Sequence, residues 1–209
     1  WLVYRLTDSA FYLGLAGTFS LLPSLILTPF VGVLADKVDR RRILLITQSA
    51  ALVHSLLLAT LVVTGATSLP LLLGLALFQG IIQGFDWTNR QSLLAQLVDD
   101  RADLPNAIAL NSTSFNLARI LGPSLAGALI VASGEAACFL AAACAEAAAL
   151  QFTRRLRLPP HPASAGPRPH VADELREGLR YAWHEPAIRR TLALVALSSA
   201  TVLPYAALL

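Results

Sequence analysis

The chain has 209 residues, of which 56% are hydrophobic and only 14% are charged. Soluble domains carry about 25% charged residues, and here the deficit is concentrated in a few long uncharged runs, which argues against a soluble enzyme and for a membrane protein. The net charge of +3 does not indicate nucleic-acid binding, because the basic residues lie between apolar runs rather than among aromatics on a soluble face.

Long apolar runs predict an all-α membrane protein, because about 20 helical residues cross roughly 30 Å of hydrocarbon. Residues 1–9 are typical of the tail of a preceding span and a short turn. The first complete span, about 10–35, contains Pro23 and Pro29, which membrane helices tolerate. Further spans are expected at about 43–64, 69–88, 107–132 and 137–153.

Residues 154–190 are expected to form a long connection, rich in proline and arginine at its start. Within it, residues 171–185 have the pattern of an amphipathic helix that lies on the membrane surface or under the bundle. A last apolar run, 191–209, begins another span. We therefore expect an incomplete half-bundle over residues 1–153, a central loop and the start of a second half.

The distribution of basic residues predicts the orientation. Of the 16 Lys and Arg residues, all but Arg5 and Arg119 lie in three alternate connections. Because basic connections stay on the cytoplasmic side, we expect a multi-pass protein of the inner cell membrane whose cytoplasmic loops are 36–42, 89–106 and 154–190.

The connection that starts at Gly32 reads Gly-Val-Leu-Ala-Asp-Lys-Val-Asp-Arg-Arg-Arg. It resembles the loop signature G-x-L-a-D-[RK]-x-G-R-[RK] between spans 2 and 3 of the major facilitator superfamily, with Asp39 where Gly is usual. The resemblance implies that the chain holds spans 2–6 of the N-terminal half, the central loop and part of span 7. Span 1 and most of the C-terminal half are then expected elsewhere in the same polypeptide. The residues that match and are expected to act in gating are Gly32, Asp36, Lys37, Arg40 and Arg41.

A polar stripe follows the span at 69–88. Gln79, Gln83, Asp86 and Arg90 are spaced by four, three and four residues, which places them on one helical face. This stripe either packs between helices or lines a cavity or gate; in the superfamily the equivalent span lines the central cavity, which favours the second interpretation. Because Asp86 and Arg90 lie near the cytoplasmic end, we expect a charge network with Asp36 and Arg40 that holds or releases a cytoplasmic gate.

The span at 107–132 carries a second resemblance. Residues 118–127 are similar to the exporter signature G-x-x-x-G-P-x-x-G-G of the superfamily: Gly122, Pro123 and Gly127 match, and small residues there permit close helix packing. Residues 84–94 and 106–112 look like the exporter branch that includes enterobactin-type siderophore and macrolide efflux proteins. Asn116 is a candidate cavity-lining residue on this span.

Arg119 is a cation within the same span and needs a partner. Glu146 is the nearest acid by depth, and two interpretations remain open: a structural ion pair, or a carboxylate that takes part in proton coupling.

The sequence contains no nucleophile–base pair, phosphate-binding loop or metal-ligand cluster, so we expect neither an enzyme nor a resident cofactor or metal. The resemblance implies a secondary active transporter that exports a drug-like or siderophore-like small molecule across the bilayer by alternating access, driven by the proton gradient. Two alternatives stay open: a solute importer of the same superfamily, and a non-transporting receptor, scaffold or membrane domain of an enzyme.

Overall fold

The computed structural model describes residues 2–35, 39–94, 97–98, 100–156 and 171–208. Over these ranges every regular element is a helix, which confirms the expected all-α class. The chain divides into two compact units, Trp1–Ser164 and Ala165–Leu209, and each is described by itself. Asp36 and Lys37 of the loop signature lie outside the described residues.

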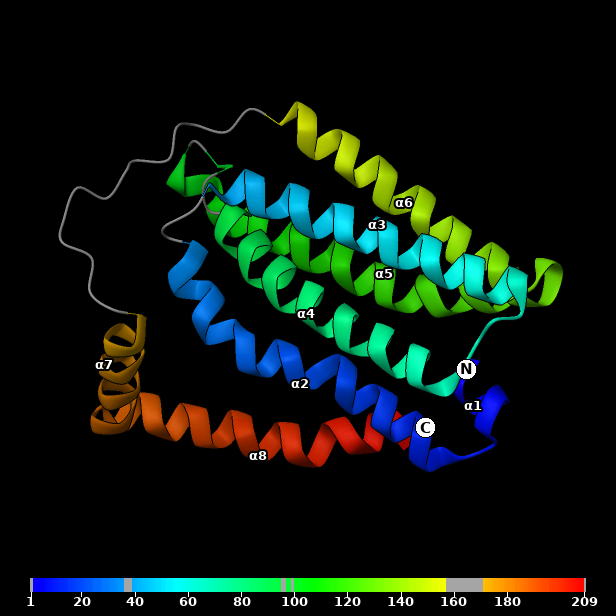
Figure 1. Ribbon diagram of the computed structural model, residues 1–209. Coiled ribbons are helices and arrows are strands. Elements are labelled where there is room, and N and C mark those ends of the chain that lie inside the picture. The colour runs from blue at the N-terminus through cyan, green and yellow to red at the C-terminus, as the bar shows by residue number, and fades with distance from the viewer. Residues whose placement is uncertain (1, 36–38, 95–96, 99, 157–170, 209) are drawn as a thin grey trace. The chain divides into compact units, whose positions relative to one another are not determined.

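The first unit is a bundle of long helices (Figure 1). Among the described residues, five helices are long and apolar enough to cross a membrane, as the sequence predicts. Four of them are longer than the expected spans, because the helix continues beyond the apolar run at one or both ends. The elements are α1 (Leu2–Thr7), α2 (Ala10–Ala35), α3 (Arg40–Thr64), α4 (Leu69–Leu94), the 3₁₀ turn η1 (Arg101–Asp103), α5 (Leu104–Ser133) and α6 (Glu135–Arg155).

Local chemistry explains where the helices begin and end. The carboxylate of Asp39 accepts a hydrogen bond from the backbone N–H of Arg41 at 3.0 Å and so caps the N-terminus of α3. The departure from Gly at this signature position therefore has a structural use. Gly65 ends α3 with a φ of 68°, and Gly134 separates α5 from α6 with a φ of 82°, both in the region that favours glycine.

The closest helix contact in the bundle joins α2 to α4. A Cβ atom added at Gly80 would lie 2.4 Å from the backbone oxygen of Ser20, and one added at Gly84 would lie 3.2 Å from the Cα of Ser24. Two small residues four apart on each helix thus let the backbones touch, as is common in membrane helices. On the other side of α4, α3 packs against both α4 and α6 (Figure 1).

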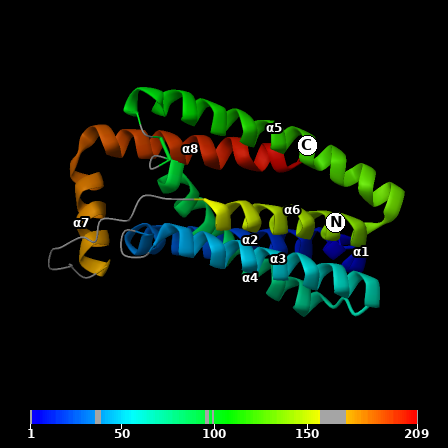
Figure 2. The ribbon, with the colours of Figure 1, turned by 90° about the horizontal axis from the view of Figure 1, so that it is seen from above.

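Helix α5 is less integrated into the bundle. It runs apart from α3 and α4 and reaches α6 at the Gly134 turn (Figure 2), and none of its described residues is buried. One aromatic contact joins it to α4: Phe115 packs edge-on against Trp87, with ring centroids 5.2 Å apart. A Cβ added at Gly122 or Gly127 would meet no described atom within 4 Å, so the close packing expected of the exporter signature is not made among the described residues.

The second unit consists of α7 (Val171–His184) and α8 (Pro186–Leu208). Helix α7 closely follows the predicted amphipathic segment. Pro186 opens α8, a position where proline is well tolerated because its missing N–H would be unpaired anyway. The division into a half-bundle, a central loop and a following span stays a prediction.

Candidate functional site

A small polar cavity lies where α3, α4 and α6 meet. Its volume is about 190 Å³, and each of the three helices contributes polar side chains to its wall. Buried polar groups within membrane-spanning helices are costly, and they cluster where they can interact with one another or with water. We call this space the polar cavity; the polar side chains on its wall are Thr47, Gln48, Gln79, Gln83, Asp86, Arg90 and Glu146.

The stripe predicted on α4 contributes four of these side chains. Asp86 and Arg90, one helical turn apart, form a salt bridge of 2.6 Å between Oδ2 and Nε. The hydroxyl of Thr47 on α3 donates to the other carboxylate oxygen of Asp86 at 3.3 Å. Gln79 and Gln83 border the same cavity, so the structure brings the whole stripe to one wall.

Glu146 enters the polar cavity from α6. Asp86 and Arg90 border the same cavity as its carboxylate. The sequence-based pairing with Arg119 is not formed: Arg119 is exposed on α5, and no salt bridge joins it to an acid among the described residues. Glu146 lies instead on the wall that α6 shares with α3 and α4, so a similar depth in the membrane does not bring the two side chains together.

Three hydrogen bonds join the N-terminal end of α3, which carries the signature residues Arg40 and Arg41, to the neighbouring helices. Asn89 of α4 is fully buried, and its amide donates to the backbone oxygen of Arg40 at 2.7 Å. The guanidinium of Arg41 donates to the backbone oxygens of Thr153, at 3.3 Å, and of Arg154, both in the last turn of α6. The signature residues Arg40 and Arg41 therefore hold α3 against α4 and α6.

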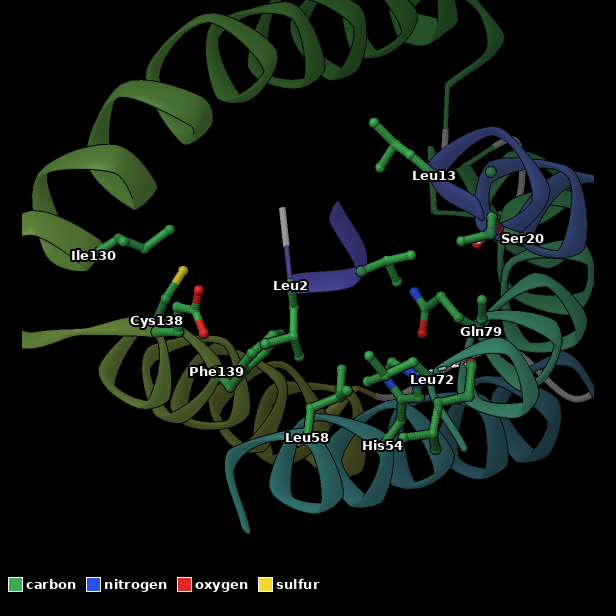
Figure 3. Close-up of a pocket in the computed structure, with 16 residues that line it drawn as sticks. Leu2, Leu13, Ser20, His54, Leu58, Leu72, Gln79, Ile130, Cys138 and Phe139 are labelled. Carbon is green, nitrogen blue, oxygen red and sulfur yellow. Dashed lines mark hydrogen bonds between the residues drawn. The ribbon is translucent and has the colours of Figure 1, made fainter. Parts of the chain in front are cut away.

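A larger cavity of about 480 Å³ lies further along the bundle. Its wall is mainly apolar, with Gln79 and Ser20 on one side and Cys138 and Phe139 across from them (Figure 3). Gln79 borders both this larger cavity and the polar cavity, so the two spaces are neighbours that share one side chain.

Two titratable residues also line the larger cavity. Nε2 of His54 lies 3.1 Å from the backbone oxygen of Leu75, which suits the role of a hydrogen-bonded packing residue. Glu135 begins α6, and its side chain is only 7% exposed; one carboxylate oxygen lies 3.0 Å from the guanidinium of Arg5. This ion pair joins the start of α6 to α1.

The candidates on α5 occupy different surroundings. Asn116, Gly122, Pro123 and Gly127 are exposed. Sequence reasoning also missed Thr47, Gln48 and Asn89, although each is a polar residue within or beside an apolar run. That signal was available, but periodicity along one helix does not show which residues of a neighbouring helix share its polar face.

Comparison with known proteins gives a consistent result. The whole chain, residues 1–209, matches the profile of a family described as transmembrane secretion effector. The staphyloferrin A transporter of Staphylococcus aureus (strain NCTC 8325 / PS 47) is 30% identical over 145 residues, which cover 68% of this chain and 36% of that protein. The multidrug efflux pump Tap of Mycolicibacterium fortuitum is 28% identical over 212 residues, covering 93% of this chain and 49% of that pump.

The chain thus spans about half or less of the length of these curated relatives. No solved structure matches it. The match over the whole length agrees with the five apolar helices of the described residues, which make this a multi-pass protein of the cell membrane. The chain belongs to the transmembrane secretion effector family of the major facilitator superfamily.

Proposed function

We propose that the chain is part of a secondary active transporter that exports a small molecule. The observation that carries this proposal is the set of charged side chains on the wall of the polar cavity, which has the larger cavity as its neighbour. Charged side chains within membrane-spanning helices are costly, and they are usually kept for a function. Packing alone does not require Asp86, Arg90 and Glu146, whereas a transport pathway uses such groups.

The larger cavity supports a substrate with a sizeable apolar part. Its volume of about 480 Å³ and its mainly apolar wall with a few polar groups fit the usual character of small-molecule sites. The relatives are named as a siderophore transporter and a multidrug efflux pump, which supports a siderophore-like or drug-like cargo. Their greater length supports a second six-helix half of the same polypeptide that completes the pathway.

The proton gradient is the energy source of this proposal, and no cofactor or catalytic step is part of it. The sequence offers no phosphate-binding loop that could hold ATP, and the carboxylates of the polar cavity are groups that can bind and release protons. Alternating access would come from the two halves rocking about the substrate site.

The test is flux in inverted membrane vesicles that contain the full-length protein, with Hoechst 33342 and tetracycline as probes. Acidifying the vesicle interior should drive both probes inward, which corresponds to export from the cell, and a protonophore should abolish this. Vesicles without the protein are the control. Flux in the opposite direction would indicate the importer, and flux that ignores the pH gradient for every probe would contradict the proposal.

A further inference from the structure

The polar cavity carries more acid than its cation can neutralise. Among the described residues, α3 contributes no ionisable side chain to its wall, whereas α4 contributes Asp86 and Arg90 and α6 contributes Glu146. Arg90 is committed to Asp86 by the 2.6 Å salt bridge. Glu146 is therefore a second carboxylate on a wall to which the described residues contribute one guanidinium. It lies in a helix long and apolar enough to cross the membrane.

Gln48 supplies an independent sign that the polar cavity takes a ligand. The residue is only 4% exposed, and its side-chain oxygen has no hydrogen-bond partner. Buried acceptors are rarely left without a donor, because the desolvated oxygen loses its bond to water and gains nothing in return. The free acceptor and the surplus carboxylate border the same cavity of about 190 Å³, which has room for a few water molecules.

We propose that the polar cavity is the proton-binding site of the transporter, with Glu146 as the carboxylate that takes up the proton. Protonation converts Glu146 into a neutral O–H donor, and the oxygen of Gln48 accepts its hydrogen bond directly or through one water. The net charge of the three ionisable groups then rises from −1 to zero. A sodium ion would also satisfy free oxygens, but it would have to sit beside the guanidinium of Arg90, which repels it.

Protonation of Glu146 also changes the interactions of neighbouring side chains. This step of the inference rests on the proposed transport function. With Glu146 ionised, Arg90 is attracted by two carboxylates; with Glu146 protonated, Arg90 belongs to Asp86 alone. Gln79 lies between this cavity and the larger one. The proton and the proposed cargo thus occupy neighbouring spaces that share a side chain, so that uptake of one alters the wall of the other.

The experiment compares two modes of transport in vesicles that hold the full-length protein. One is accumulation of Hoechst 33342 driven by a pH gradient; the other is exchange of labelled for unlabelled tetracycline at equal pH on both sides. Glu146→Gln should reduce the first at least tenfold, while exchange stays within about twofold, because exchange at equal pH requires no net uptake or release of a proton. Glu177→Gln, at an exposed position on α7, is the matched control and should change neither mode.

Gln48→Met keeps the volume of the side chain but removes the acceptor. It should shift the pH dependence of driven transport toward more acidic values, since the protonated acid loses its partner. Loss of both modes in Glu146→Gln, an unchanged pH profile in Gln48→Met, or driving by a sodium gradient in the wild type would each overturn the proton site. Absence of driven flux in the wild type would instead refute the proposed transport function.

Discussion

Asn89 shows how one side chain can fix the contact between two membrane helices. Its amide donates a 2.7 Å hydrogen bond to the backbone oxygen of Arg40, which lies in the first turn of α3. The side chain is 0% exposed, so neither water nor lipid can replace this bond if it is lost. A small polar residue here therefore determines how α3 sits on α4.

Asn89→Asp should lower the free energy of unfolding by about 1–3 kcal/mol, because the ionised carboxylate cannot donate and faces a carbonyl oxygen in a buried position. Thermal unfolding of the purified full-length protein in detergent measures the change. Asn106→Asp, exposed in the first turn of α5, is the matched control and should be neutral or slightly stabilising near a helix N-terminus. Equal midpoints for the two variants would contradict this role of Asn89.

Arg41 acts at the same end of the bundle through its planar guanidinium. It reaches two consecutive carbonyl groups of α6, those of Thr153 and Arg154. Lysine keeps the charge but lacks the rigid fork of donors that serves two acceptors at once. The signature arginine therefore works here by geometry as well as by charge.

Arg41→Lys should lower the free energy of unfolding by about 1 kcal/mol through the loss of one bond, and it should reduce driven transport as well. Arg42→Lys, at the exposed neighbouring position, makes the same chemical change without removing those hydrogen bonds. It should leave the free energy of unfolding and driven transport unchanged. The interpretation fails if the two variants behave alike in unfolding and flux measurements.

At the scale of elements, the contact between α2 and α4 depends on the absence of side chains. Gly80→Ala places a Cβ 2.4 Å from the backbone oxygen of Ser20, and backbone atoms cannot move aside as a flexible side chain can. The helices must separate, which should cost about 1–3 kcal/mol of stability, as overpacking does elsewhere.

Gly74→Ala is the matched control on the same helix, since its added Cβ meets nothing within 4 Å. It should be neutral or stabilising, because alanine favours helix over glycine by about 1 kcal/mol. Unfolding midpoints measured side by side give the comparison, and a destabilised Gly74→Ala with an unaffected Gly80→Ala would refute the packing argument.

The helices themselves were predictable from the sequence, because lipid leaves few options for an apolar run of this length. The ends of the helices were harder to predict. Asp39, for example, is recognised as the cap of α3 only from the hydrogen bond that its carboxylate accepts from the N–H of Arg41. The α4 stripe was predictable because it lies on one helix. The neighbours of Glu146 were not predictable. The position of a residue along its helix gives its depth in the membrane, but which helices its side chain faces depends on how α6 packs on α3.

On the scale of the whole molecule, the exposed polar residues of α5 need surroundings other than lipid. It carries Asn116 and Arg119, both exposed, and an arginine in a membrane span faces protein or a water-filled space rather than lipid. The curated relatives are about twice as long as the matching region or longer. In the proposed transporter with a second half, we therefore expect this polar face of α5 to turn toward that half.

The orientation of the bundle follows from its charges. Residues 65–68 and 133–134 carry no Lys or Arg, whereas Arg101, Arg154 and Arg155 lie at opposite helix ends. Basic residues near span ends stay in the cytoplasm, so the Gly65 and Gly134 turns should face outward. The same assignment places Arg40 and Arg41, at the start of α3, on the cytoplasmic side.

Labelling with a membrane-impermeant maleimide tests this arrangement in whole cells. In a full-length background in which every native cysteine, Cys138 and Cys144 included, is replaced by alanine, Ala66→Cys and Ser133→Cys should react in intact cells. Arg101→Cys and Arg155→Cys should react only after permeabilisation, because helices that each cross the membrane once place these positions inside. The reverse pattern would invert the bundle and put the polar cavity near the outer surface. A mixed pattern would mean that one of the five helices does not cross.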